Sequence, residues 1–295
     1  MNATDIQYLR SSDGTPGFSW NPITGCAPGL SCWYYCWARK MSQRLKGRFG
    51  YDKDEPFKPT FHADRLEEPM RIKKPATIAT CFMGDLFLAT NEQIDQVFAV
   101  MSICEQHTFL ALTKRTGRMA KYLADSSLED RIDYICHQRA DGVDDTWHYP
   151  AMWPLPNVLL GTSISTQAEA GVRIPHLLDC LGRKWLSIEP IEGPINLEPY
   201  LSALDWIVVG GGPFPVHPDW VRDIRDQCKA AEVPFFFKQW GAWLPQSQFE
   251  PGMVWSKSRE DHYFDPHHRT LRVGKKMAGR LLDGIEYSEL PEGRP

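Results

Sequence analysis

Short apolar runs recur along the first 240 residues, and a segment with helical periodicity follows most of them. The runs are rich in β-branched and aromatic residues, which is typical of strands. Several do not alternate with polar residues, as expected of parallel strands covered on both faces. This rhythm predicts an α/β fold with parallel strands, arranged as a full or partial (β/α) barrel. The expected strands lie within residues 18–24, 77–87, 108–115, 157–165, 183–191, 205–212 and 234–240.

Helix signals occur between these runs. Thr90 and Gln93 have the spacing of a capping box, and Pro218 suits a first helical turn. We expect a barrel domain over residues 1–245, interrupted by an insertion at about 124–156. Residues 246–295 lose the pattern and predict an irregular C-terminal extension packed on the barrel.

Composition narrows the class of protein. The chain has 295 residues, of which 42% are hydrophobic, and a formal net charge of −4. This balance argues against non-specific nucleic-acid binding through the whole surface, but it allows a local basic patch such as residues 272–280. The start lacks a signal-peptide pattern, and no run is apolar enough to span a membrane. We therefore expect a cytoplasmic protein with reduced thiols.

Three of the eight cysteines are clustered. Cys26, Cys32 and Cys36 are separated by gaps of five and three residues, whereas the other five are scattered and read as buried apolar residues. No fourth Cys or His lies at a short spacing, so a closed zinc site is incomplete. Three thiolates also suit a [4Fe–4S] cluster with one open iron. After a first barrel strand, such a loop would lie at the mouth where active sites form.

The cysteine segment resembles radical S-adenosylmethionine (radical SAM) enzymes. More closely, it is similar to a phage and bacterial family whose members begin with W-N-P-x-T-G-C, and more distantly to spore photoproduct lyase. The cysteine gaps are wider than the usual three and two, and the loop at 209–220 is shorter than in relatives. The shared motifs are Trp20–Cys26, Met83–Phe87, Leu112–Arg115, Gly161–Ser163, Ser187–Pro190, Val209–Gly211, His217–Cys228 and Phe235–Gly241.

This resemblance implies roles for several residues. Cys26, Cys32 and Cys36 would ligate the [4Fe–4S] cluster, and S-adenosyl-L-methionine would chelate its open iron. Tyr35 would lie near the adenine, unless it only packs beside the cluster. Asp85 would accept the cofactor's amino group, unless it is a helix cap.

Further candidates follow later strands. Neighbouring residues of a strand point to opposite faces, so only one of Lys114 and Arg115 is expected to meet the cofactor carboxylate or a phosphate. Ser163 and Glu189 are candidates for binding ribose hydroxyls or substrate, with simple pairing to a neighbouring cation as the alternative for Glu189.

The sequence thus predicts a radical SAM enzyme that uses an external electron donor. The phage association of the resembled family suggests a nucleic-acid base as substrate, for modification or repair, and Trp147, Tyr149 and Trp153 are candidates for stacking on it. Two alternatives stay open. One is a non-catalytic zinc protein that interacts with nucleic acid, and the other is a degenerate family member that binds S-adenosylmethionine without cleaving it.

Overall fold

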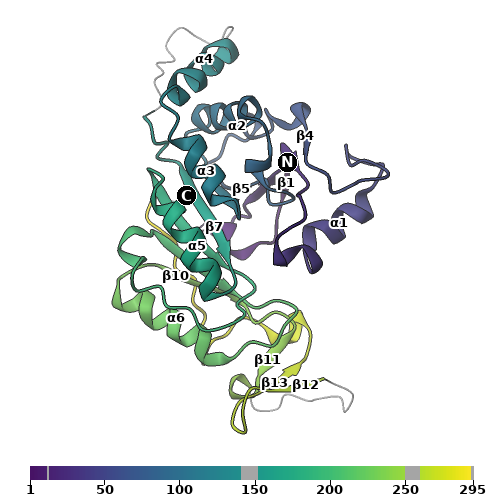
Figure 1. Ribbon diagram of the computed structural model, residues 1–295, viewed down its shortest axis with the longest axis vertical. Coiled ribbons are helices and arrows are strands. Elements are labelled where there is room, and N and C mark those ends of the chain that lie inside the picture. Colours follow the sequence, from purple (N-terminus) through teal and green to yellow (C-terminus); the bar gives the residue numbers. More distant parts are fainter. Residues whose placement is uncertain (12, 141–151, 250–259, 294–295) are drawn as a thin grey trace. The chain divides into compact units, whose positions relative to one another are not determined.

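The computed structural model describes residues 1–11, 13–140, 152–249 and 260–293 (Figure 1). Its main sheet has eight strands in the order β1-β2-β5-β6-β7-β8-β9-β10. The pairings β2–β5, β5–β6, β8–β9 and β9–β10 are parallel, and β1 is antiparallel to β2. The strands are β1 (Asn2–Ala3), β2 (Phe18–Trp20), β5 (Thr77–Thr80), β6 (Thr108–Thr113), β7 (Val158–Ile164), β8 (Arg183–Ile188), β9 (Trp206–Gly210) and β10 (Phe235–Gln239).

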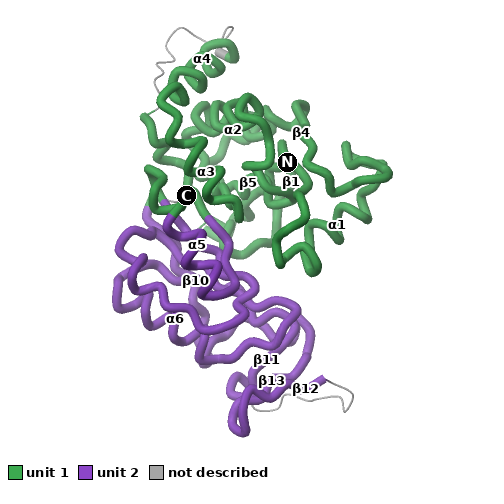
Figure 2. The backbone as a smooth tube through the Cα atoms, viewed as in Figure 1, with its two compact units in different colours: residues 1–161, 176–183, 293–295 green, residues 162–175, 184–292 purple. Residues whose placement is uncertain are grey.

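Each of the seven predicted strand regions contains at least one strand of the structure. The sheet is open, with β1 and β10 at its edges, so the predicted α/β fold is confirmed in its partial-barrel form. The chain divides into two compact units (Figure 2). Unit 1 comprises residues 1–161, 176–183 and 293–295, and unit 2 comprises residues 162–175 and 184–292.

Unit 1 contains the first helices and a two-stranded sheet of β3 (Ile23–Thr24) and β4 (Thr60–Phe61). Helix α2 begins with the predicted capping box, in which Thr90 and Gln93 satisfy each other's backbone amides. Buried Trp20 and Phe109 pack together in the core, with ring centroids 5.7 Å apart. The helices are α1 (Trp37–Leu45), α2 (Asn91–Ile103), α3 (Thr116–Leu123) and α4 (Leu128–Ala140).

A buried carboxylate joins three of these helices. Asp95 of α2 accepts a hydrogen bond from the Tyr122 hydroxyl of α3 at 2.6 Å. Its other oxygen accepts from Nε of Arg131 in α4 at 2.8 Å. Because Asp95 is only 2% exposed, these bonds replace the water that it loses. Helix α4, which lies in the predicted insertion, is thereby attached to α2.

Unit 2 contains helices α5 and α6 and a small antiparallel sheet in the order β11-β13-β12. Helix α6 starts with Pro218 in its first turn, as predicted, and His217 is its N-cap residue. Two strands of the small sheet lie in residues 246–295, which were expected to be irregular. The prediction missed them because strands of three or four residues are too short to show a periodic pattern. The elements are α5 (Gln167–Leu178), α6 (Pro218–Ala230), β11 (Trp243–Pro245), β12 (Asp261–Tyr263), β13 (Arg269–Arg272) and α7 (Lys275–Ala278).

The last part of the chain lies along β10. Trp206 Nε1 donates to the Glu289 carbonyl at 2.9 Å, and the Phe235 amide donates to the Glu289 carboxylate at 2.8 Å. Of the aromatic residues proposed to stack on a base, Trp147 and Tyr149 lie outside the described residues. Trp153 packs against Phe98, with ring centroids 5.8 Å apart. Within the described ranges, none of the helices combines the length and the hydropathy needed to cross a membrane.

We expect His62 to make the stability of the protein depend on pH. It is 6% exposed, and its Nε2 lies 2.8 Å from Thr24 Oγ1. Burial, and then the nearby Arg65 charge, lower its pKa from 6.5 to about 4. Between pH 6.5 and 4, the unfolded chain therefore binds a proton at this histidine more readily than the folded chain does. The free energy of unfolding is highest above pH 6.5 and decreases as the pH falls towards 4. The loss should be about 3 kcal/mol.

Chemical unfolding of wild type and His62→Gln between pH 7.5 and 4.5 measures this contribution. Because glutamine does not titrate, the difference between the two free energies of unfolding should shrink as the pH falls. The exposed His267→Gln should track wild type throughout. A difference that stays constant over this pH range would contradict the role of His62.

Candidate functional site

Three of the predicted site residues come together in unit 1, just beyond the carboxyl ends of its parallel strands. Cys26 follows the parallel strand β2 and the short antiparallel strand β3, Asp85 follows the parallel strand β5 and Arg115 follows the parallel strand β6. The guanidinium of Arg115 and the carboxylate of Asp85 both lie close enough to the Cys26 thiol to shift its pKa, Asp85 upwards and Arg115 downwards. These residues are 59 and 30 positions apart in the chain, so only the sheet brings them together.

Two glycines attach the cysteine loop to the loop after β5. Gly25 and Gly84 form a parallel bridge, in which the Gly25 amide donates to the Met83 carbonyl at 3.0 Å and the Asp85 amide donates to the Gly25 carbonyl at 3.2 Å. A Cβ on Gly84 would lie 2.6 Å from the Gly25 carbonyl oxygen, and Gly25 itself has φ = 83°. Side chains are therefore excluded at both positions, and the start of the cysteine loop is fixed.

Asp85 joins the ends of β5 and β6. It is 4% exposed, and its carboxylate accepts from Thr113 Oγ1 at 2.7 Å, from the Phe87 amide at 3.1 Å and from the Lys114 amide at 3.3 Å. Burial raises the pKa of Asp85, while these hydrogen bonds and the Arg115 charge oppose that shift. The bond to Phe87 makes Asp85 the cap of the 3-10 helix Leu86–Leu88, the alternative that the sequence left open.

Arg115 has unused hydrogen-bonding capacity. Its Nε and Nη2 atoms are buried and have no hydrogen-bond partner among the described residues. A buried polar atom without a partner is costly, and a guanidinium presents its donors in a fork that matches a carboxylate or phosphate. Of the two neighbouring cations, Lys114 contributes its amide to Asp85, whereas Arg115 offers its side chain to the site.

The other two clustered cysteines lie on the segment that leads into α1. Cys32 is in the 3-10 helix Ser31–Tyr34, Tyr35 is its C-cap residue, and Cys36 is the N-cap residue of α1. All three clustered cysteines are half-buried, whereas the five scattered ones are buried as predicted. Burial, and to a lesser extent Asp85, raise the pKa of the Cys26 thiol, while Arg115 opposes the shift. A metal would therefore have to displace the proton of Cys26 on binding.

The spacing of the three sulfurs differs from that of a single-ion site. In a tetrahedral zinc site with Zn–S bonds of about 2.3 Å, the sulfurs lie about 3.8 Å apart. Over the described part of the chain, the cysteine thiols form no group of three whose sulfurs all lie within 4.8 Å of one another. A cluster that binds each sulfur at a different iron accepts a wider spacing than one ion does.

Ser163 and Glu189 form a second polar group, in unit 2. Glu189 Oε2 pairs with Lys238 Nζ at 2.6 Å, and its Oε1 accepts from Gln239 Nε2 at 3.2 Å. Ser163 is 3% exposed, and its hydroxyl lies 3.5 Å from the Glu189 carbonyl. Lys238 and Gln239 lie at the end of the expected strand within residues 234–240, but the sequence does not reveal that they hold Glu189. Pairing with a cation, the alternative foreseen for Glu189, is therefore present.

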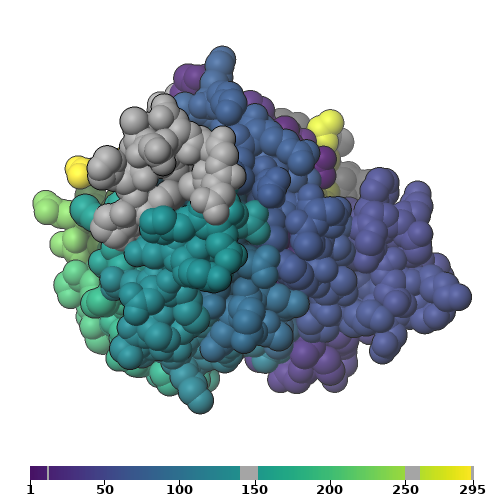
Figure 3. All heavy atoms as spheres, turned by 90° about the horizontal axis from the view of Figure 1, so that it is seen from above, coloured from purple at the N-terminus to yellow at the C-terminus, as the bar shows by residue number. Residues whose placement is uncertain are grey.

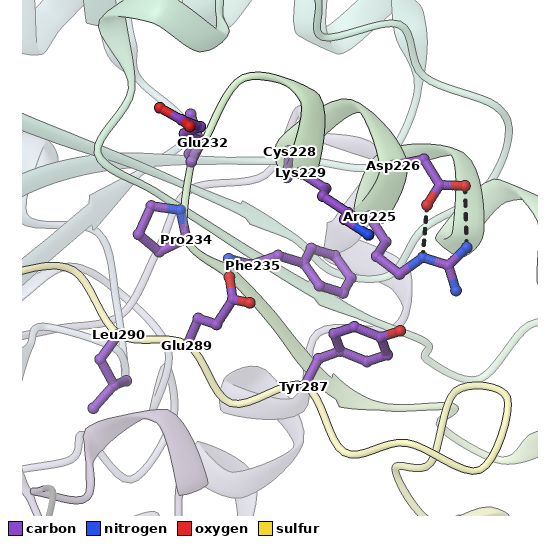
Figure 4. Close-up of a pocket in the computed structure, with 11 residues that line it drawn as sticks. Arg225, Asp226, Cys228, Lys229, Glu232, Pro234, Phe235, Tyr287, Glu289 and Leu290 are labelled. Atoms are coloured by element: carbon purple, nitrogen blue, oxygen red, sulfur yellow. Dashed lines mark hydrogen bonds and ion pairs between the residues drawn. The ribbon is translucent and has the colours of Figure 1, made fainter.

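A cavity of about 700 Å³ in unit 2 lies elsewhere in the fold (Figure 4). It is lined by the end of α6, the start of β10 and the C-terminal segment. This is the amino end of β10, whereas ligands of open parallel sheets bind beyond the carboxyl ends. Three of its charged residues already have partners, because Arg225 contacts Asp226 at 2.8 Å and Glu289 holds the Phe235 amide. We therefore do not place the site there.

Two features were missed by the sequence reasoning. The first is a basic and aromatic surface on residues 31–50, which five Lys and Arg residues without any Asp or Glu could have signalled. The second is a group of His217, Asp219 and His268 in unit 2. The pairs His217–Asp219 and His267–His268 were the available signals, but their convergence depends on the tertiary structure.

Comparison with solved structures gives weak similarity to spore photoproduct lyase. One variant with bound AdoMet and a dinucleoside spore photoproduct has a TM-score of 0.38 and 8% identity, covering 90% of this chain and 71% of that one. A second variant, with the dinucleoside alone, has a TM-score of 0.37, 9% identity and coverages of 94% and 74%. At these TM-scores the similarity supports no argument about fold or chemistry.

Family membership is clearer. No curated protein matches the chain. One family, described as "Protein of unknown function (DUF5131)", matches residues 4–291, almost the full length. The chain therefore belongs to the DUF5131 family.

Proposed function

We propose that this protein is a radical SAM enzyme in which Cys26, Cys32 and Cys36 hold a [4Fe–4S] cluster. The observation that carries the proposal is the meeting of Cys26 with Arg115 and Asp85 beyond the carboxyl ends of parallel strands. Active sites of parallel α/β folds form at this edge. The site combines a soft metal ligand with a cation whose buried donors lack partners among the described residues.

The donor set fits the cluster better than it fits zinc. Three thiols leave one iron of a cubane open, whereas a structural zinc ion requires four ligands. Within the described residues, the sulfurs are also not gathered as closely as one zinc ion would need. The non-catalytic zinc protein therefore remains the second candidate, and metal analysis distinguishes the two.

Each residue of the site has a role that its contacts support. Arg115 would bind the carboxylate of S-adenosylmethionine through the two nitrogens that no described residue partners. Asp85 would act mainly as a positioning residue, because three donors already occupy its oxygens. Its contact with the cofactor's amino group, and the place of Tyr35 near the adenine, stay predictions. When bound, the reduced cluster and S-adenosylmethionine supply a 5′-deoxyadenosyl radical that abstracts hydrogen from the substrate, with the electron coming from an external donor.

Anaerobic reconstitution with iron and sulfide tests the cluster. Wild type should hold about four irons per chain, and Cys26→Ala, Cys32→Ala and Cys36→Ala should each lose most of them because a three-thiolate site has no spare ligand. Cys104→Ala, which removes a buried thiol of unit 1, is the matched control and should keep its iron.

Equal iron content in the Cys26→Ala and Cys104→Ala proteins would reject the assignment. One zinc per chain and no iron would favour the zinc protein. Release of 5′-deoxyadenosine on addition of dithionite distinguishes an enzyme from a degenerate family member that binds S-adenosylmethionine without cleaving it.

The affinity for S-adenosylmethionine tests Arg115 separately. Arg115→Gln should weaken binding to the cluster-loaded protein by about 10- to 100-fold, because a charge-assisted hydrogen bond is lost. Equilibrium dialysis with labelled cofactor measures the change. Arg118→Gln is the matched control, since Arg118 already has Asn91 as a partner. Equal affinities of the two variants would show that Arg115 does not bind the cofactor.

For the substrate, we propose a nucleic acid that contacts residues 31–50, the basic aromatic face. This segment carries Arg39, Lys40, Arg44, Lys46 and Arg48 but no acidic residue, in a chain whose net charge is −4. The face lies on α1 and its flanks, and Figure 3 shows this part of the chain, in indigo, as open surface.

Exposed aromatic residues accompany these charges. Tyr34, between the second and third clustered cysteines, is 85% exposed, and Trp37 at the start of α1 is 57% exposed. Exposed aromatic rings among cations are suited to stacking on unpaired bases while the cations contact phosphates. Because Cys32 and Cys36 lie on the same segment, a strand bound here would lie next to the cysteine loop.

Salt-dependent binding tests this face. The triple variant that combines Lys40→Gln, Arg44→Gln and Lys46→Gln should bind a single-stranded oligonucleotide more weakly than wild type. The slope of log affinity against log salt should fall by about 2 to 3, since three phosphate contacts are removed. Fluorescence anisotropy at several salt concentrations measures it. Lys73→Gln with Lys74→Gln, at exposed residues outside this face, should leave the slope unchanged, and an equal effect of both variants would contradict the proposal.

A further inference from the structure

Three metal-binding side chains converge in unit 2, away from the cysteines. One ligand atom from each of His217, Asp219 and His268 lies within 4.8 Å of the other two. Asp219 Oδ2 is 3.7 Å from His217 Nδ1 and 3.8 Å from His268 Nε2. Both distances are too long for hydrogen bonds, so the groups face a common point without bonding to one another through these atoms.

The fold fixes all three residues. His217 and Asp219 are the N-cap residue and the second residue of α6, and His268 immediately precedes β13 in the turn after β12. The rings of His217 and His268 lie with centroids 4.3 Å apart, and Phe264 packs edge-on against His217 at 5.0 Å. A turn that is about 50 residues further along the chain is thus held against the start of α6.

Neighbouring groups orient the candidate ligands. Asp265 Oδ2 lies 2.7 Å from His268 Nδ1, which favours a proton on Nδ1 and leaves the Nε2 lone pair directed towards Asp219. Arg222 Nη1 holds the other oxygen of Asp219 at 2.8 Å. A carboxylate that holds the second ring nitrogen, as Asp265 does for His268, is typical of metal-ligating histidines. His217 Nδ1 accepts the Asp219 amide at 3.2 Å, and a metal would take this lone pair in place of the amide.

We propose that His217, Asp219 and His268 form a binding site for a divalent transition-metal ion, with zinc as the best match. Two imidazoles and one carboxylate are ligands that zinc prefers, and three protein ligands leave a position for water. In a tetrahedral site with bonds of about 2.1 Å, ligand atoms lie about 3.4 Å apart. Asp219 Oδ2, at 3.7 and 3.8 Å from the two histidine nitrogens, therefore needs to approach each of them by only a few tenths of an ångström. The ion would clamp the β12–β13 turn to the start of α6, independently of the iron–sulfur proposal.

Zinc content and thermal unfolding test the site. Purified protein is stripped of metal, dialysed against zinc and washed, and the bound zinc is counted for wild type, His268→Gln, Asp219→Asn and His267→Gln. The first two variants should each hold one zinc fewer than wild type. His267→Gln, at the exposed neighbouring histidine, should hold the same amount. Counting the difference between variants excludes any zinc that the cysteines bind.

Zinc should also raise the Tm of wild type and His267→Gln by several degrees more than that of His268→Gln or Asp219→Asn, because binding to the folded state alone stabilises it. Asp219→Asn keeps the shape of the side chain, so it tests the ligand even if His268→Gln folds poorly. Equal zinc content in all four proteins would overturn the proposal, as would equal shifts of Tm.

Discussion

The buried carboxylate of Asp85 is the constraint on which the candidate site of unit 1 depends. It holds the hydroxyl of Thr113 and the amides of Phe87 and Lys114, and so joins the loops after β5 and β6. A buried carboxylate is stable only when such donors replace water. With these two strand ends joined, Arg115 leaves β6 close to the cysteine loop, and its charge acts on the Cys26 thiol.

The contact of Gly25 with Gly84 joins the start of the cysteine loop to the loop after β5. A Cβ on Gly84 would meet the backbone of Gly25, and a Cβ on Gly25 would meet the Lys58 carbonyl, so neither position has room for a side chain. The first clustered cysteine follows Gly25 directly. Cys26 is thus fixed by backbone, whereas Cys32 and Cys36 are carried by a 3-10 helix and the start of α1. A soft ligand, a buried acid and a cation with unused donors therefore meet in one place.

Unit 2 uses its polar residues differently. Glu189 forms an ion pair with Lys238 and accepts a hydrogen bond from Gln239, so both oxygens of its carboxylate already have partners. In the group of His217, Asp219 and His268, the Asp219 Oδ2 atom instead lies 3.7 and 3.8 Å from the two histidine nitrogens, too far for a hydrogen bond to either. Polar atoms that converge without bonding are better suited to an added cation than a salt bridge that is already formed.

The sequence by itself determined the parallel strands, the capping box of Thr90, the first turn of α6 and the clustering of three cysteines, because periodicity, caps and spacing are local properties. The tertiary structure alone decided which strand-end residues meet. It left two nitrogens of Arg115 without partners among the described residues, occupied Asp85 with three donors and paired Glu189 with Lys238. It also brought His268 to His217 across about 50 residues. Such contacts depend on which strands are neighbours and on how loops close, and no local pattern encodes them.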